Sequence, residues 1–318
     1  MKMSLLIIFF CLAVVLIVGF TMNQKIYAAD IKQEKKAILV VSFGTTYADT
    51  RKLTTEAVQN KISAVFPDYE VRHAFTSRII IKKLAECDGI KVDTEKQALD
   101  KLKAEGYKEI IIQPLHIEPG DEYEKLMRVV DNYEKSKAFN KIAVGRPFLY
   151  YTGQEGKPDD YLAAIKALQM QFPKLGNHEA IALMGHGGVN PANTAYAALQ
   201  LKLEDAGLKK VYIFTVDGYP TFYNLKNKLK ENKIKKVVLM PLMLVAGNHA
   251  NEDLAGDNKD SFKSQLIQAG YTVEIYLHGL GENSKVQDIY VEHINDAMEG
   301  KYTKTERGKD RPPIPIID

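Results

Sequence analysis

The sequence predicts an α/β protein with two similar lobes, each a parallel-type sheet flanked by helices, and a cleft between the lobes. Short apolar runs rich in β-branched residues alternate with amphipathic helical stretches along the chain. Runs such as AILVV and VVLM lack in/out alternation, which is typical of strands buried on both faces of a parallel sheet. The two halves of the chain also repeat the same landmarks. The length of 318 residues, with 46% hydrophobic and 26% charged residues, excludes disordered and fibrous classes.

The expected elements follow from local hydrophobic periodicity. Each strand is a short β-branched or apolar run, and these runs cover 37–42, 70–74, 109–114, 141–144, 180–184, 210–215, 235–241 and 272–276. Longer stretches with apolar residues at helical spacing separate them and cover 49–66, 94–105, 122–135, 159–171, 191–206 and 220–231. Strands that alternate with helices in this way predict a parallel sheet.

An internal repeat supports the two lobes. The segment VVSFGTT (40–46) and the segment ALMGHGG (182–188) both run from a strand into a glycine-containing loop. Later, IIIQPLHIEPGDEYEKL (110–126) can be laid on VVLMPLMLVAGNHANEDL (237–254). Chance similarity between short α/β segments is the alternative. Four matching landmarks in the same order favour duplication.

The repeat places the lobes at about 30–150 and 151–300, and it lays Glu122 on His249. Ligands of open α/β sheets bind beyond the carboxyl ends of the strands. We therefore expect these loops to line the cleft.

Both ends of the chain are predicted to lie outside the lobes. Residues 1–29 are typical of an export signal, with an uncharged apolar run over 5–20 and small residues for cleavage after Ala28 or Ala29. The alternative is a retained anchor, because the 22 uncharged residues 3–24 are enough to span a bilayer. In either case we expect the folded part to be exported, periplasmic or otherwise extracytoplasmic. The tail 301–318 is charged and then Pro-rich, which predicts a flexible extension.

Charge, cysteines and motifs exclude several function classes. Without the leader, 41 basic residues face 40 acidic ones, so no strong field for nucleic acid follows. Cys87 is the one cysteine outside the leader, which rules out a disulfide within the mature chain and a Cys-based zinc site. The sequence has no G-x-G-x-x-G, G-x-S-x-G or H-E-x-x-H motif. Nucleotide-dependent and serine-hydrolase chemistry are therefore disfavoured.

Three predicted strand ends of the second half carry potential metal ligands. His186 lies in GHGG, His249 lies in AGNHA, and Asp217 lies in TVDGY between them. Imidazole and carboxylate ligands suit a divalent first-row metal held with open coordination positions. The sequence thus predicts a metal site formed by His186, Asp217 and His249.

Two turns of the first half carry further polar groups. The segment HIEPGDE (116–122) joins a strand to a helix, and its acids at 121 and 122 lie in the first helical turn. Stabilisation of the helix dipole is one interpretation of these acids, and we favour it for Asp121. Because Glu122 falls on His249 in the repeat, we expect Glu122 to point into the cleft. The turn SFGTT (42–46) is typical of an anion-binding loop before a helix.

The motifs LVVSFGTTYADT, AFTSRIIIKKL, QPLHIEPGDEYEKL, GHGG, TVDGYP and MPLMLVAGNHANEDLAGD together resemble the anaerobic-type sirohydrochlorin cobaltochelatases, the CbiK family. The resemblance covers about residues 36–300 and implies the fold of the class II chelatases, which include ferrochelatase. It implies that His186 and His249 bind the metal and that Asp217 matches a third ligand that is normally Glu. It implies that Glu122, opposite the metal, handles pyrrole protons.

The resemblance predicts a lyase-type metal chelatase that inserts Co²⁺, with Fe²⁺ as a further metal, into sirohydrochlorin without ATP, in cobalamin-type biosynthesis. No nucleotide and no organic cofactor are expected, and a homo-oligomer is compatible with the sequence. Metal insertion requires an ion held by exchangeable ligands and a base for two pyrrole protons, which fits histidines and a carboxylate. His186 is also expected to act in catalysis. The substrate's carboxylates are expected to meet Ser42, Gly44, Thr45, His116 and Arg78.

An alternative function belongs to another class. The leader is compatible with an exported tetrapyrrole- or metal-binding protein that uses the same cleft for capture or transport. The retained ligand positions favour the enzyme.

Overall fold

The computed structural model describes residues 34–302 of the chain. The predicted leader 1–29 lies outside the described residues, and so does the predicted tail after Tyr302. Within residues 34–302, no helix combines the length and the apolar character needed to cross a bilayer.

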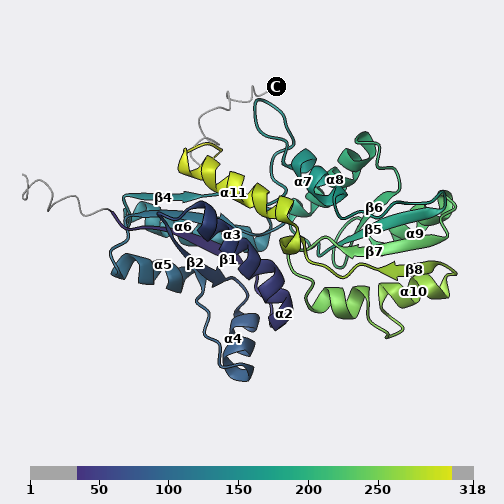
Figure 1. The fold of residues 1–318 in the computed structure, drawn as a ribbon, viewed down its shortest axis with the longest axis horizontal. Helices are drawn as coiled ribbons and strands as arrows, with labels where there is room; N and C mark the ends of the chain where they lie inside the picture. The colour runs from purple at the N-terminus through teal and green to yellow at the C-terminus, as the bar shows by residue number, and fades with distance from the viewer. Residues whose placement is uncertain (1–33, 303–318) are drawn as a thin grey trace, which may run out of the picture. The chain divides into compact units, whose positions relative to one another are not determined.

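Two four-stranded parallel sheets form the framework (Figure 1). In the first sheet the strands lie in the order β2-β1-β3-β4, and in the second they lie in the order β6-β5-β7-β8. The second order is the first one repeated, with β5 in the place of β1 and β7 in the place of β3. The predicted fold class is confirmed. The strands are β1 (Lys36–Ser42), β2 (Glu70–Phe75), β3 (Glu109–Pro114), β4 (Lys141–Val144), β5 (Glu179–Gly185), β6 (Val211–Thr215), β7 (Lys236–Pro241) and β8 (Thr272–Ile275).

Each predicted helical segment is helical in the structure. The predicted helix 49–66 is α2 (Ala48–Arg51), a π-helical turn η1 (Lys52–Glu56) and α3 (Ala57–Val65). Helices α4, α10 and α11 lie outside the predicted helical segments. The remaining elements are α4 (Arg78–Cys87), α5 (Glu95–Ala104), α6 (Asp121–Lys135), α7 (Asp160–Gln169), η2 (Pro191–Asn193), α8 (Thr194–Asp205), α9 (Phe222–Glu231), η3 (His249–Leu254), α10 (Phe262–Gln268), η4 (Leu280–Glu282) and α11 (Ser284–Met298).

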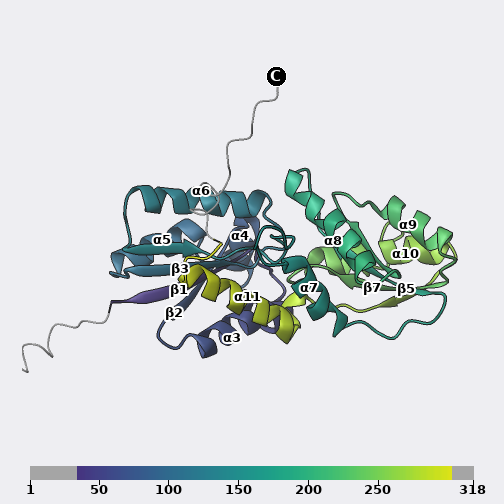
Figure 2. The ribbon, with the colours of Figure 1, turned by 90° about the horizontal axis from the view of Figure 1, so that it is seen from above.

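Helices cover both faces of the first sheet, as Figure 2 shows. Along β1, Ala37 and Leu39 belong to a cluster with α5 and α6, whereas Ile38 and Val40 belong to a cluster with α3 and α11. Alternate residues of a strand point to opposite faces, so a strand covered on both sides must be apolar at every position. This explains the unbroken apolar run of β1.

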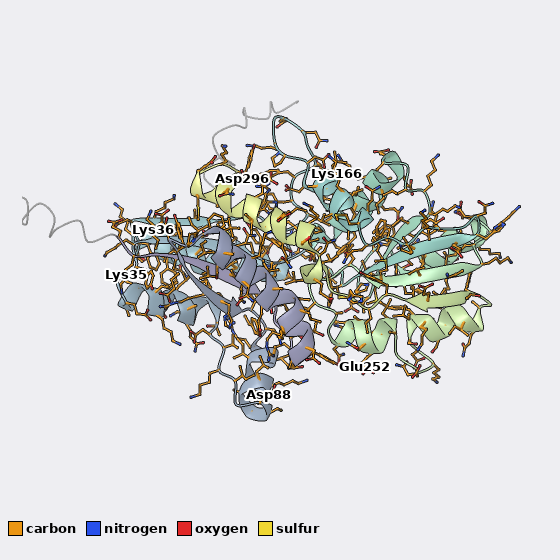
Figure 3. The ribbon with its side chains drawn as sticks, viewed as in Figure 1. Lys35, Lys36, Asp88, Lys166, Glu252 and Asp296 are labelled. Carbon is orange, nitrogen blue, oxygen red and sulfur yellow. The ribbon has the colours of Figure 1, made fainter. Side chains whose placement is uncertain are left out.

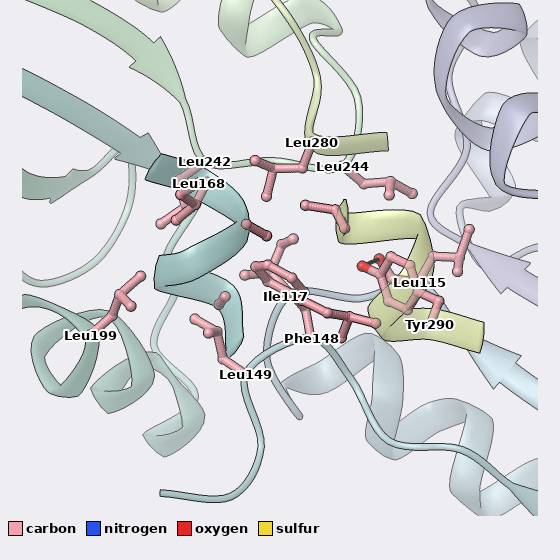
Figure 4. Packing of buried hydrophobic residues seen from close by; sticks show 14 of the residues in the cluster. Leu115, Ile117, Phe148, Leu149, Leu168, Leu199, Leu242, Leu244, Leu280 and Tyr290 are labelled. Carbon is pink, nitrogen blue, oxygen red and sulfur yellow. Dashed lines mark hydrogen bonds between the residues drawn. The ribbon is translucent and has the colours of Figure 1, made fainter. Parts of the chain in front are cut away.

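The second sheet is covered in the same way, and one core connects the two sheets. Buried residues of α9 and α10 pack on one face of β5, and residues of α7 and α8 pack on the other. The residues of α7 and α8 belong to the same hydrophobic cluster as Ile38 and Val40 of β1, part of which Figure 4 shows. At its centre, the Tyr290 hydroxyl donates to the Leu115 carbonyl oxygen at 3.2 Å.

Helix α11 ties the end of the described chain to the first sheet. It lies in the range predicted as the second lobe, yet it packs against β3, β4 and α3 as well as α7. The buried guanidinium of Arg146 binds Asp160 on α7 at 3.0 Å and Asp296 on α11 at 2.6 Å. Figure 3 labels Asp296 on this helix. Removing either aspartate would leave the buried Arg146 charge partly unpaired, which is costly. The two ion pairs therefore hold α7 and α11 in place.

Candidate functional site

A cavity of about 600 Å³ lies at the carboxyl ends of the two central strands of each sheet. In each sheet the strand order reverses between these two central strands, because the next strand in the sequence is added on the opposite side. Ligands of α/β sheets usually bind at such switch points. The predicted residues Gly44, Thr45, His116, Glu122, His186 and His249 all line the cavity. Its walls are the loops after β1, β3, β5 and β7, together with Ile80 and Lys83 of α4.

His186 and His249 meet in this cavity. Their rings are edge to face, with 4.7 Å between the centroids. Nδ1 of His186 lies 2.9 Å from the carbonyl oxygen of Gly187, and Nδ1 of His249 lies 2.5 Å from Oδ2 of Asp253. A carbonyl or carboxylate oxygen only accepts hydrogen bonds, so each Nδ1 is the donor, and in the neutral form of each ring the lone pair lies on Nε2. Two neighbouring imidazoles with free Nε2 atoms are a natural pair of metal ligands.

Two glycines explain how the loop of His186 approaches the loop of Asp217. Gly187 has φ +76°, and a Cβ there would lie 2.8 Å from the backbone nitrogen of Gly218. A side chain at either position would push the two loops apart. The close approach lets the Asp217 amide donate to the His186 carbonyl oxygen at 2.9 Å.

The carboxylate of Asp217 does not join the two imidazoles. Asp217 is exposed and is absent from the cavity wall, although its backbone touches that of His186. In the described part of the chain, no group of three or more His, Cys, Asp or Glu side chains is placed to hold a metal ion. The structure therefore brings together two of the three predicted ligands, and the role of Asp217 stays a prediction.

Glu122 enters the same cavity from the first sheet, at the start of α6. Its Oε1 accepts a hydrogen bond from Lys125 at 2.7 Å. Burial acts to raise the pKa of Glu122, but the Lys125 ammonium and the Thr76 hydroxyl together hold this pKa below its ordinary value. Its Oε2 is buried without a hydrogen bond of good geometry. In the free protein Glu122 is thus an ionised carboxylate at the cavity wall.

Glu118 is a cavity residue that the sequence analysis did not single out. Its Oε2 accepts a hydrogen bond from the Tyr196 hydroxyl at 3.2 Å, so the contact links the loop after β3 to helix α8, which packs on the second sheet. Burial raises the pKa of Glu118 above its ordinary value, although the Tyr196 hydrogen bond opposes the shift. Its position in the same strand-to-helix turn as Glu122 was the available signal.

His116 is a wall residue whose two ring nitrogens are both buried. Neither ring nitrogen has a hydrogen-bond partner, and both are shielded from solvent. Burial lowers the pKa of His116 to about 4 from its ordinary 6.5, against the opposing charges of Glu122 and Glu95. The imidazole is therefore neutral at physiological pH.

Two of the residues expected to meet the substrate's carboxylates lie elsewhere. Ser42 is buried and Arg78 is absent from the cavity wall. The Arg78 guanidinium binds the buried Glu95 carboxylate through two hydrogen bonds of 2.9 and 2.7 Å. Lys83 and Lys125 are the lysines that line the cavity within residues 34–302. The sequence could not show that Arg78 pairs with Glu95, because the two residues meet only in the folded chain.

Comparison with known proteins identifies the family. A sequence model described as cobalt chelatase (CbiK) matches residues 36–299, which is most of the chain. This chain belongs to the CbiK cobalt chelatase family. It is 40% identical over 264 residues to the sirohydrochlorin cobaltochelatase of Salmonella typhimurium, covering 83% of this chain and 97% of that protein. It is 34% identical over 268 residues to the sirohydrochlorin cobaltochelatase CbiKC of Nitratidesulfovibrio vulgaris, covering 83% of this chain and 91% of the relative.

Solved structures share the fold at low sequence identity. SirB from Bacillus subtilis with Fe³⁺ has a TM-score of 0.56 and 16% identity, and the match covers 85% of this chain and 99% of that one. The sirohydrochlorin chelatase SirB from Bacillus subtilis subspecies spizizenii in complex with cobalt has the same TM-score, the same coverage and 14% identity. These likenesses support the two-sheet α/β fold of the CbiK family member described here.

Proposed function

We propose that this chain is a sirohydrochlorin cobaltochelatase, a lyase-type enzyme that inserts Co²⁺ into the tetrapyrrole of cobalamin biosynthesis. The observation that carries the proposal is the composition of one cavity. Two imidazoles with free Nε2 atoms come from the second sheet, and an ionised carboxylate comes from the first. A volume of about 600 Å³ lies in the range of small-molecule sites.

The reaction exchanges one Co²⁺ for two protons. Nε2 of His186 and Nε2 of His249 hold the incoming ion and replace part of its water shell. As two pyrrole nitrogens bind the ion, each loses its N–H proton, and the Glu122 carboxylate accepts one of them. Glu118 and Asp121 are further carboxylates in the cavity wall. The ion leaves the imidazoles when four ring nitrogens bind it, and the released protons pass to water.

Other parts of the wall suit a large polycarboxylate ring. Phe43 lines the cavity with half of its surface exposed, so its ring is available to pack on a tetrapyrrole face. Lys83 and Lys125 provide positive charge for carboxylates, and Gly44 and Thr45 provide the loop before α2. We propose that the reaction uses Fe²⁺ as a further metal and needs no nucleotide or organic cofactor.

The test follows insertion by absorbance after purified protein is mixed with sirohydrochlorin and Co²⁺. We expect turnover in the wild type, and we expect its loss in His186→Ala and in His249→Ala with no change in the unfolding midpoint. His178→Ala, at an exposed histidine outside the cavity wall, is the matched control and should keep full activity. Near-normal turnover in either cavity variant would show that the ligand assignment is wrong. Tight binding of tetrapyrrole and Co²⁺ without turnover would favour the capture or transport function.

We also propose that the protein is exported, because the segment 1–29 has the pattern of an export signal. Fractionation of expressing cells, combined with the mass of the purified N-terminus, tests this. A mature chain that begins at Ala29 or Asp30 outside the cytoplasm is the expected result. An uncleaved chain in the membrane fraction would support the retained anchor, and an uncleaved chain in the cytoplasm would refute export.

A further inference from the structure

We propose that Asp253 is a positioning residue for metal transfer, which orients His249 and makes it the stronger of the two imidazole ligands. The proposal rests on the proposed function of the cavity as the metal site. Asp253 does not line the cavity, so it acts on the metal only through His249.

The backbone around this pair is a π-helical turn, η3, which begins at His249 directly after the loop that follows β7. Such turns are rare and are frequently found at functional sites. The Asn251 side-chain amide donates to the carbonyl oxygens of Ala246 and Gly247 at 3.0 and 2.8 Å, which braces the loop. Ala250 and Leu254 are fully buried and anchor the turn in the core. His249 and Asp253 are therefore held on a fixed backbone.

The hydrogen bond between the pair determines which nitrogen faces the metal. Oδ2 of Asp253 accepts from Nδ1 of His249 at 2.5 Å, so in the neutral ring the proton lies on Nδ1 and the lone pair on Nε2. His186 has a different partner, because its Nδ1 donates to the neutral carbonyl of Gly187. A carboxylate partner increases the basicity of a ligating imidazole more than a neutral carbonyl does. The two imidazoles of the site are thus unequal donors.

Substitution of Asp253 separates charge from hydrogen bonding. In Asp253→Asn the side-chain carbonyl can still accept from Nδ1, so His249 acquires a neutral partner like that of His186. Loss of a partner of this kind typically weakens metal binding about 10- to 100-fold. We expect a loss of this size in calorimetric titrations with Co²⁺ alone, and partial rescue by Asp253→Glu. The Co²⁺ d–d absorption bands should shift in Asp253→Asn, a change that a purely structural role would not produce.

The chain offers a matched control outside the cavity. Nδ1 of His278 lies 2.7 Å from Oε2 of Glu282, with the same spacing of four residues. Neither residue lines the cavity. Glu282→Gln should leave the Co²⁺ affinity and the Co²⁺ spectrum unchanged.

The outcomes distinguish this inference from the proposed function. Wild-type Co²⁺ affinity in Asp253→Asn, together with lost binding in His249→Ala, would overturn the role of Asp253 and leave the metal site intact. Unchanged Co²⁺ binding in His249→Ala would overturn the proposed metal site itself. If Asp253→Asn does not fold, ¹⁵N NMR of the wild-type imidazoles decides, and a His249 ring without a proton on Nδ1 would refute the inference.

Discussion

His116 should make the protein sensitive to acid, because its imidazole is buried in its neutral form. Its pKa is about 4 in the folded protein and 6.5 ordinarily, since burial disfavours the charged ring. Between these values the unfolded chain binds a proton that the folded chain excludes. The stability that depends on neutral His116 is therefore fully present above pH 6.5 and is lost as the pH falls towards 4.

The magnitude follows from the difference between the two pKa values. One pKa unit corresponds to about 1.4 kcal/mol. The contribution of His116 to the free energy of unfolding should fall by about 2 kcal/mol between neutral pH and about pH 5, and by about 3 kcal/mol at about pH 4. The two ring nitrogens have no hydrogen-bond partner, so an apolar replacement breaks no bond.

Urea unfolding at a series of pH values measures this effect in the wild type and in His116→Leu. Other titrating groups are common to both proteins, so they cancel in the difference between the two curves. We expect the variant to gain on the wild type by about 2 kcal/mol as the pH falls to about 5. His178→Leu, at an exposed position, should keep the wild-type slope. Parallel curves for His116→Leu and the wild type would refute a buried neutral imidazole at this position.

Three further predictions concern the cavity. Glu122→Gln should reduce the insertion rate strongly, while the variant still binds sirohydrochlorin and Co²⁺. The control Glu124→Gln, in the same helical turn but outside the cavity wall, should have little effect on the rate. An unchanged rate in Glu122→Gln would leave Glu122 only the role of stabilising the helix dipole. Lys125→Ala should raise the pKa of Glu122, so the acid limb of the pH profile of kcat/KM should move to higher pH. Lys82→Ala is the control and should leave this profile unchanged. If the acid limb does not move in Lys125→Ala, Glu122 is not the base. Asp217→Glu should bind Co²⁺ at least as tightly as the wild type, and Asp217→Ala less tightly, in calorimetric titrations; equal affinities in all three would remove Asp217 from the site.

The pKa of Glu122 depends on two opposing effects in the folded chain. Burial acts to raise this pKa, but in the free protein it is lowered, because the Lys125 ammonium lies 2.7 Å from its oxygen three residues along the helix. Sequence spacing alone showed that the two residues could meet on α6. It could not show that their attraction exceeds the effect of burial.

The sequence by itself determined the eight strands, their parallel arrangement and the loops that carry His186, His249 and Glu122. These are local properties, because a strand buried on both faces must be apolar throughout and its carboxyl end must leave the core through a loop. The family motifs are also visible in the sequence, and they predicted metal insertion as the chemistry of these loops. Only the tertiary structure decided which side chains share the cavity. Arg78 pairs with Glu95, Asp217 stays outside the wall, and Glu118 meets Tyr196 across the two sheets. These outcomes depend on contacts between residues far apart in the chain, where burial and charge balance are set by the packing of both sheets together.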